Sequence, residues 1–257
     1  MCELLGMSAN VPTDLCFSFK GLRERGGNTG PHKDGWGIAF YQGKGVTTFK
    51  DAIASYQSEI AALVSNYPIK STSVVGHVRQ ANRGKVALEN THPFTRELWG
   101  RYWTYAHNGQ LTDYDDLPCE RFTPVGTTDS ERAFCFILSE LAKKYPDGPR
   151  RRRDVFSVVK TLSDRLRALG VFNLLLSDGD FLFCYCTTKL HYITRRAPFS
   201  VARLSDIDVD IDFSRETTPN DVVTVIATMP LTCNEQWQSL QAGQACLFKA
   251  GECVRQW

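Results

Sequence analysis

The chain has 257 residues, of which 42% are hydrophobic and 23% are charged, and these proportions argue against a disordered chain, a collagen or a coiled coil. Its 30 Lys and Arg residues nearly balance its 28 Asp and Glu residues, so we expect no nucleic-acid partner. The sequence has neither a basic segment before an early apolar stretch nor an apolar run near the ~18 residues of a membrane span, so we expect neither export nor a membrane partner.

The first half of the sequence contains three segments with the composition of β-strands. They are short, rich in β-branched and aromatic residues, and bounded by glycine or polar clusters. They span residues 36–41, 73–79 and 102–107. The third segment is followed by Asn108-Gly109, a dipeptide suited to positive φ. We therefore predict that this strand stops at a turn that presents backbone N–H groups.

Two helices are predicted in the middle of the chain. Apolar residues recur at helical spacing between residues 128 and 144, where Thr128 and Glu131 have the spacing of a capping box. A second apolar face runs over residues 155–169. Four arginines at 150–153 join the two helices, and because no aromatic stacking platform adjoins them, we interpret them as a solvated loop rather than an RNA or phosphate site.

The second half of the sequence is again dominated by strands. Residues 171–176 and 181–186 flank a Ser-Asp-Gly-Asp turn and are apolar at nearly every position, so both faces of this hairpin should be covered. Further strands are predicted at residues 190–194, 222–228 and 245–249. Many strands beside two helices indicate an α+β fold in which a sheet packs between another sheet and a helical layer. Because no repeat or low-complexity block interrupts the chain, we interpret residues 1–257 as one domain.

The nine cysteines predict the redox environment of the protein. Their number is odd, and without a signal peptide we expect free thiols in a reducing compartment, by default the cytoplasm. No Cys-x-x-Cys spacing occurs, so a zinc site is not expected. The segment Gly43-Lys44-Gly45 lacks the upstream glycine of a phosphate loop, and we expect no cofactor.

Cys2 is the cysteine whose position suggests chemistry. It follows Met1, and its side chain is small enough that removal of Met1 by an aminopeptidase is expected. A thiol on the first residue then has its own α-amine as a nearby base. A cysteine at position 2 is by itself weak evidence, so this hypothesis depends on motifs elsewhere in the chain.

Five further motifs occur in the order and approximate spacing found in class II glutamine amidotransferases. They are His32–Ala39, Gly76–Asn82, Asn90–Phe94, Ala106–Gly109 and Thr128–Glu131. Together with Cys2 they resemble the glutaminase domain of that family over the whole chain, and Pro230–Trp237 resembles a segment of its stand-alone branch. The resemblance implies the αββα sandwich of N-terminal-nucleophile hydrolases, in which two antiparallel sheets lie between helical layers.

The resemblance also implies roles for individual residues. Cys2 would attack the side-chain amide of glutamine, forming a γ-glutamyl thioester and releasing ammonia, after which water frees glutamate. The Asn108 side chain and the Gly109 N–H would form the oxyanion hole. Arg79 would bind the α-carboxylate of the substrate and Asp129 its α-ammonium group. Further substrate contacts are expected from Trp36, Gly37 and Asn82.

Some of these residues also have plainer interpretations. A strand-end ion pair would explain Arg79, and a favourable charge at a helix N-terminus would explain Asp129. The histidines at 77, 92 and 107 fit no helix or zinc-knuckle spacing, so we interpret them as structural and predict no metal site. Two departures from the family pattern are Asn82, where many relatives have threonine, and His32-Lys33, where Arg-Gly is familiar.

Three functions are compatible with the sequence. A glutaminase and a γ-glutamyl amidohydrolase acting on a peptide or thiol conjugate would share the nucleophile and differ in the room beyond the amide nitrogen. A non-catalytic regulatory or binding module with the same fold is the third, and the intact set of site residues argues against it. One glutaminase-like domain would occupy the whole length, so an ammonia-using synthase is expected only as a separate subunit. The sequence does not decide whether the chain forms a homo-oligomer.

Overall fold

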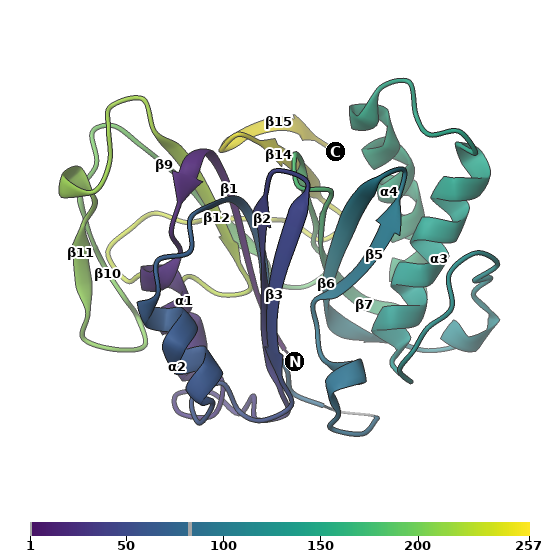
Figure 1. Ribbon diagram of the computed structural model, residues 1–257, viewed down its shortest axis with the longest axis horizontal. Coiled ribbons are helices and arrows are strands. Elements are labelled where there is room, and N and C mark those ends of the chain that lie inside the picture. Colours follow the sequence, from purple (N-terminus) through teal and green to yellow (C-terminus); the bar gives the residue numbers. More distant parts are fainter. Residues whose placement is uncertain (1, 82–83) are drawn as a thin grey trace.

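The computed structural model describes residues 2–81 and 84–257, and in them two large antiparallel sheets lie face to face (Figure 1). The seven-stranded sheet contains, in spatial order, β13 (Gln238–Ser239), β9 (His191–Arg196), β12 (Val222–Ala227), β1 (Glu3–Thr13), β4 (Ser71–Val78), β2 (Trp36–Gln42) and β3 (Gly45–Asp51). The six-stranded sheet contains β15 (Glu252–Gln256), β14 (Ala245–Lys249), β8 (Leu182–Tyr185), β7 (Gly170–Ser177), β6 (Arg101–Leu111) and β5 (Phe94–Leu98).

Helices cover the outer faces of both sheets (Figure 1). The seven-stranded sheet is covered by α1 (Cys16–Arg25) and α2 (Glu59–Asn66), and the six-stranded sheet by α3 (Asp129–Lys144) and α4 (Arg152–Arg167). Smaller elements are η1 (Leu88–Asn90), η2 (Tyr114–Asp116), η3 (Phe213–Arg215) and a separate two-stranded sheet of β10 (Val201–Arg203) and β11 (Asp210–Asp212). The predicted four-layer sandwich is confirmed.

Separate apolar clusters fill the spaces between the layers. One cluster lies between the two sheets. A second lies between the six-stranded sheet and its helices, and a third between the seven-stranded sheet and its helices. In β7, Leu174 and Leu176 pack toward α3 and α4, whereas Leu175 packs against the other sheet. This alternation confirms that the apolar hairpin of β7 and β8 is covered on both faces. None of the described helices is long and apolar enough to cross a membrane.

The sequence-based prediction missed α1 and α2. No side chain caps the start of α1 and its first turn has no acidic residue, so the usual start signals are missing. Helix α2 has only 8 residues, which is short for a 3.6-residue period to be recognised, although Ser58 accepts a capping hydrogen bond from the N–H of Ala61. Both helices depend on burial of apolar residues such as Leu22 and Val64 against the seven-stranded sheet.

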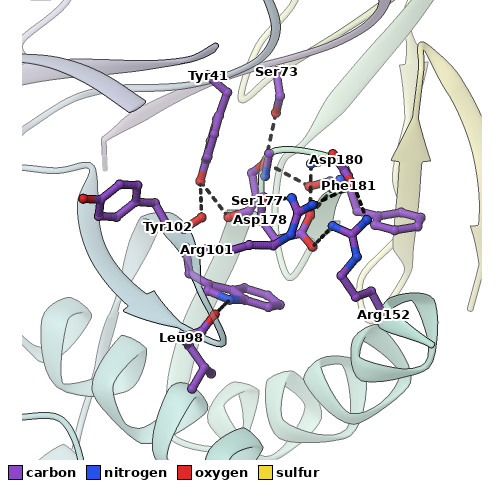
Figure 2. Close-up of polar contacts among 12 residues, drawn as sticks. Tyr41, Ser73, Leu98, Arg101, Tyr102, Arg152, Ser177, Asp178, Asp180 and Phe181 are labelled. Carbon is purple, nitrogen blue, oxygen red and sulfur yellow. Dashed lines mark hydrogen bonds and ion pairs between the residues drawn. The ribbon is translucent and has the colours of Figure 1, made fainter. Parts of the chain in front are cut away.

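The arginine run at 150–153 is only partly the solvated loop that was predicted. Arg152 begins α4 and forms ion pairs with Asp178 and Asp180 in the turn between β7 and β8 (Figure 2). Arg101 of β6 joins the same cluster, with its Nη2 3.4 Å from a carboxylate oxygen of Asp180. The carboxylate of Asp178 is fully buried, and burial raises its pKa. Arg153 of α4 also donates to the carbonyl oxygen of Val254 in β15 at 2.7 Å, so two arginines of the run tie α4 to the sheet that it covers.

The segment Pro230–Trp237 joins β9 to the separate sheet of β10 and β11. The carboxylate of Glu235 accepts hydrogen bonds from Arg195 Nε at 2.8 Å and Nη2 at 2.6 Å. Asn234 accepts a hydrogen bond from the N–H of Arg203 at 2.8 Å. The side chains of Arg195 and Glu235 are only 9% and 11% exposed. Polar residues of this segment therefore have a structural function.

Replacing Glu235 with glutamine should lower the free energy of unfolding by about 1–3 kcal/mol at neutral pH, since it weakens a charge-assisted pair. Burial acts to raise the pKa of Glu235, but the hydrogen bonds and charge of Arg195 outweigh burial, and the net pKa is lowered. A carboxyl with a lowered folded-state pKa stabilises the fold above its unfolded pKa of about 4.3, and this contribution is lost as the pH falls through the folded pKa. Urea denaturation at several pH values should show the difference between the two proteins shrinking in acid.

The adjacent pair provides a matched control for this substitution. Arg196 and Glu252 form an ion pair of 2.9 Å whose side chains are 55% and 49% exposed. Exposed pairs contribute at most about 1 kcal/mol, so Glu252→Gln should change stability little. Equal losses of unfolding free energy in Glu235→Gln and Glu252→Gln would contradict a larger contribution from the buried pair of Arg195 and Glu235.

Candidate active site

Cys2 lies in a cavity of about 90 Å³ at one end of the two sheets. The lining comes from the start of β1, the segment after β4, the end of β6 and the start of α3. Its described lining residues are Cys2, Arg79, Gln80, Ala81, Gly84, His92, His107, Gly109, Gln110, Leu111, Tyr114, Thr127, Thr128, Asp129 and Ser130. Segments far apart in the sequence thus bring Cys2, Arg79, Gly109 and Asp129 to one place.

The Cys2 thiol is held by the backbone of Gln80. The N–H of Gln80 donates to Cys2 Sγ at 3.3 Å, and the carbonyl oxygen of the same residue is 3.5 Å from that sulfur. Burial raises the pKa of the thiol. The positive charge of Arg79 acts to lower this pKa, whereas the negative charge of Asp129 acts to raise it. A thiol with a raised pKa is protonated near neutral pH, so it needs a base before it can act as a nucleophile. Met1 lies outside the described residues.

Arg79 follows β4 and is held by a turn that belongs to another predicted motif. Its Nη1 donates to the carbonyl oxygens of Asp34 and Lys85, both at 3.3 Å, and its own N–H donates to the carbonyl of Gly35 at 2.8 Å. Gly35 has φ of +117°, a conformation that glycine adopts readily. The side chain of Arg79 is 4% exposed, so a guanidinium charge is fixed at the wall of the cavity.

Asp129 begins α3 and is fixed by backbone groups on two elements. One carboxylate oxygen accepts a hydrogen bond from the N–H of Leu111 in β6 at 2.7 Å, and the other accepts one from the N–H of Ser130 at 2.8 Å. The Ser130 hydroxyl also donates to this second oxygen at 3.3 Å. Each carboxylate oxygen has two lone pairs, so the oxygen that accepts from Leu111 keeps acceptor capacity for a ligand. The carboxylate therefore has a defined orientation in the cavity.

The predicted capping box at the start of α3 is half formed. Thr128 accepts a hydrogen bond from the N–H of Glu131 at 3.2 Å, as predicted. The carboxylate of Glu131 instead accepts a hydrogen bond from the N–H of Gly126 at 2.7 Å and forms an ion pair with Arg96 of β5. This tertiary partner draws the Glu131 side chain away from the backbone of Thr128, and it anchors the helix start to the six-stranded sheet.

The prediction of a turn at Asn108-Gly109 is wrong, because β6 continues through both residues to Leu111. Asn108 and Gly109 pair with Asn173 and Phe172 of β7. Gly109 has no positive φ; glycine is needed there because an added Cβ would lie 1.8 Å from the carbonyl oxygen of Val171. The propensity of Asn-Gly for turns was overridden by pairing with β7.

The two residues of this dipeptide lie differently with respect to the cavity. Gly109 lines it, whereas Asn108 is 1% exposed and directs its side chain toward the other sheet. Asn108 Nδ2 is 3.3 Å from the hydroxyl oxygen of Thr228, which directly follows β12. Thr228 was not predicted as a site residue, because nothing in the sequence near it indicates that the fold brings it to Asn108.

Three buried histidines lie at the cavity, where His92 and His107 belong to the described lining and His77 lies beside His92. The rings of His77 and His92 are tilted by 36° with centroids 4.2 Å apart. Burial lowers the pKa of His77 to about 3 and that of His92 well below its usual value. His107 contacts Ser130 Oγ at 2.8 Å and the carbonyl oxygen of Val171 at 3.1 Å. Among the described residues no group of His, Cys, Asp and Glu side chains is arranged to hold a metal ion.

Two predicted substrate contacts, Trp36 and Gly37, are not found at the described cavity. Trp36 and Gly37 do not belong to the described lining; Trp36 is fully buried beside Phe19, and Gly37 leaves room for the carbonyl of His92, which an added Cβ would approach to 2.3 Å. Asn82 lies outside the described residues.

Other site residues were missed by the sequence analysis. Gln80 contributes backbone atoms to the site, so its side-chain type gave no signal. Ser130 lies within a predicted motif, but its contact with His107 depends on the packing of α3 against β6. The positions of Gln110 and Tyr114 in the lining likewise follow from tertiary structure.

Comparison with known proteins relates this geometry to a family. The family described as "Glutamine amidotransferases class-II" matches residues 1–257. YafJ of Escherichia coli (strain K12), whose name assigns it provisionally to the glutamine amidotransferases, is 66% identical over 254 residues, which cover 99% of this chain and 100% of YafJ. A similarly named protein of Haemophilus influenzae (strain ATCC 51907 / DSM 11121 / KW20 / Rd) is 44% identical over 254 residues, which cover 99% of this chain and 86% of that protein.

Solved structures agree with this relationship. The crystal structure of a predicted glutamine amidotransferase from Pseudomonas aeruginosa PA01 is similar with a TM-score of 0.80 and 53% sequence identity, covering 99% of this chain and 100% of that one. Glutamine phosphoribosylpyrophosphate amidotransferase from B. subtilis has a TM-score of 0.61 at 16% identity, and the match covers 96% of this chain and 47% of that chain. The second likeness supports the fold alone.

Proposed function

The chain belongs to the class II glutamine amidotransferases, and we propose that it uses Cys2 to hydrolyse the side-chain amide of glutamine. The observation that carries this proposal is the shared cavity of Cys2, Arg79, Gly109 and Asp129. A thiol, a fixed cation and a fixed carboxylate are what an amino-acid amide requires for attack and for recognition of its two charged α-groups. We also propose that residues 1–257 form one glutaminase domain, because the family match spans all of them.

Substrate recognition follows from the two fixed charges. The guanidinium of Arg79 would bind the α-carboxylate of glutamine through paired N–H donors. The remaining lone pair of the Asp129 carboxylate would accept the α-ammonium group. These two contacts together select an amino acid and orient its side-chain amide toward Cys2. Trp36, Gly37 and Asn82 stay predictions as further contacts.

The chemistry begins with transfer of the Cys2 thiol proton to the α-amine of the same residue once Met1 is removed. The sulfur then forms a bond to the amide carbon, and the carbonyl oxygen becomes an oxyanion that the Gly109 N–H and the Asn108 amide stabilise. The protonated amine donates its proton to the leaving nitrogen, which departs as ammonia and leaves a γ-glutamyl thioester. Water attacks the thioester, releasing glutamate and regenerating the thiol.

A protein carrying a cleavable N-terminal tag tests the amine requirement. We expect protein with the tag retained to be inactive because the α-nitrogen of Cys2 is then an amide, which is not basic. Removal of the tag to leave Cys2 as the first residue should restore release of glutamate from glutamine. Mass spectrometry of untagged active protein should show that Met1 is absent. Full activity of the tagged protein would contradict the proposed base.

A substrate screen identifies the acyl donor. Processed enzyme should release glutamate from free glutamine faster than from γ-glutamyl peptides or thiol conjugates, because the proposal assigns both α-groups and the primary amide of glutamine to the site. The reverse preference would identify a γ-glutamyl amidohydrolase with the same nucleophile.

The proposal also covers where the released ammonia would be used. The match to glutamine–fructose-6-phosphate aminotransferase of Staphylococcus epidermidis covers 28% of that protein, so that relative contains much additional chain. We propose that any ammonia-using step here takes place on a separate subunit. The nine unpaired cysteines support the cytoplasm as the location.

A further inference from the structure

Thr228 connects the strand of the nucleophile to the proposed oxyanion-hole asparagine. Its hydroxyl oxygen accepts a hydrogen bond from the N–H of Leu4 at 2.9 Å, and Leu4 lies in β1 just after Cys2. The same oxygen is 3.3 Å from Nδ2 of Asn108 in β6. Thr228 is 3% exposed, so water does not compete freely for these groups.

The hydrogen-bonding capacity of these groups is incompletely used. A threonine hydroxyl can donate one proton, yet both contacts of Thr228 Oγ1 are to N–H groups, which are donors themselves. The side-chain oxygen of Asn108 is buried and has no hydrogen-bond partner among the described residues. A buried acceptor without a partner and a hydroxyl proton without an acceptor are both unfavourable.

A half-turn of the Asn108 amide removes both deficiencies and leaves the NH₂ group, in place of the oxygen, as the buried end without a partner among the described residues. The two ends of a carboxamide have nearly the same shape, so the surrounding hydrogen bonds decide which end faces which neighbour. After the half-turn the hydroxyl of Thr228 donates to the oxygen of Asn108 and still accepts from Leu4. The separation of 3.3 Å is long for an O–H···O bond and would shorten when substrate binds.

We propose that Thr228 is a positioning residue for glutamine hydrolysis, whose hydroxyl binds the Asn108 oxygen and thereby directs the Asn108 NH₂ group to the oxyanion. The inference rests on the proposed function and deepens it. Both N–H groups of the amide are then free of Thr228, and the donor is oriented before the charge develops, which is the condition for strong oxyanion stabilisation. Because the same hydroxyl also holds Leu4, it fixes the distance between β1 and the donor.

The backbone of Thr228 is held independently of its side chain. Its N–H donates to the carbonyl of Leu4 at 3.3 Å, and its carbonyl accepts a hydrogen bond from His191 Nδ1 at 2.9 Å. Thr228→Val keeps the shape and removes the hydroxyl, and Thr228→Ser keeps the hydroxyl. Thr224→Val is the matched control, since Thr224 is fully buried in β12 and its hydroxyl bonds to Thr194 and to the Gly251 carbonyl, away from Asn108.

Kinetics of glutamine hydrolysis by processed enzyme test the role of Thr228. We expect Thr228→Val to lower kcat about 10- to 100-fold, less than the full loss of a donor, with KM changed less than about twofold. Thr228→Ser keeps the hydroxyl, so its kcat should stay within about threefold of the native value. Thr224→Val changes a hydroxyl away from Asn108, so its kcat should stay within about the same range. Equal losses in Thr228→Val and Thr224→Val would overturn the proposal.

A double-mutant cycle asks whether Thr228 acts through Asn108. In an Asn108→Ala background the donor is already lost, so adding Thr228→Val should lower kcat by less than about twofold. If Thr228→Val lowers kcat by the same factor in both backgrounds, its role is only structural and the proposal fails.

A spectroscopic measurement separates this inference from the proposed function. Proton–nitrogen NMR spectra of asparagine-labelled protein report on the Asn108 NH₂ group without any turnover. We expect its resonances to shift in Thr228→Val and to keep their native positions in Thr228→Ser and Thr224→Val. Absence of the shift in Thr228→Val would refute the Thr228–Asn108 hydrogen bond. If the shift occurs but the native protein does not hydrolyse glutamine, the hydrogen bond stands and only the proposed reaction is refuted.

Discussion

Replacing Cys2 with alanine is expected to reduce glutamine hydrolysis by at least about 10⁴-fold, since loss of a nucleophile removes the covalent route itself. The thiol lies in the cavity with its sulfur held by the backbone of Gln80, and alanine leaves this backbone unchanged. Glutamate release by processed protein is the measurement. Native rates in the alanine variant would exclude Cys2 as the nucleophile.

Binding and a second cysteine supply the controls for this substitution. Arg79 and Asp129 are intact in Cys2→Ala, so calorimetry should still detect binding of glutamine to the variant. Cys233 is exposed and lies outside the described cavity lining, and Cys233→Ala should retain the native rate. Loss of both binding and activity in Cys2→Ala would indicate a damaged site rather than a missing nucleophile.

Replacing Asn108 with alanine is expected to lower kcat about 10²–10³-fold, the usual cost of removing one oxyanion-hole donor. KM should change little, because the donor acts on charge that develops only after attack. The side chain is 1% exposed and has no bond to Arg79 or Asp129 among the contacts that the structure describes, so the recognition of the α-groups should persist. Steady-state kinetics of processed enzyme measure both parameters.

Asn108→Asp distinguishes a missing donor from a cavity. Aspartate has nearly the same volume but replaces the NH₂ donor with an acceptor, so its kcat should fall at least as far as that of the alanine variant. Thermal unfolding of both variants shows whether the fold survives. A kcat near the native value in Asn108→Asp would eliminate the side chain as an oxyanion donor.

The sequence was informative where local pattern and tertiary environment agree. The helical period over residues 128–144 predicted α3, and the continuous apolarity of residues 171–176 predicted a strand covered on both faces. It was misleading at Asn108-Gly109, where pairing with β7 outweighs turn propensity. It was silent for α1, because that helix has neither a side-chain cap nor an acidic residue at its start and depends on burial against a sheet.

The sequence by itself determined which residues are candidates for the active site. They are a cysteine at position 2 and the motifs that contain Arg79, Asn108, Gly109 and Asp129. Only the tertiary structure decided which atoms meet, including the Gln80 backbone at the thiol and Thr228 at Asn108. The physical reason is that residue type limits the chemistry a position can supply. Strand pairing and packing between sheets, which join residues more than a hundred positions apart such as Asn108 and Thr228, set the distances over which that chemistry acts.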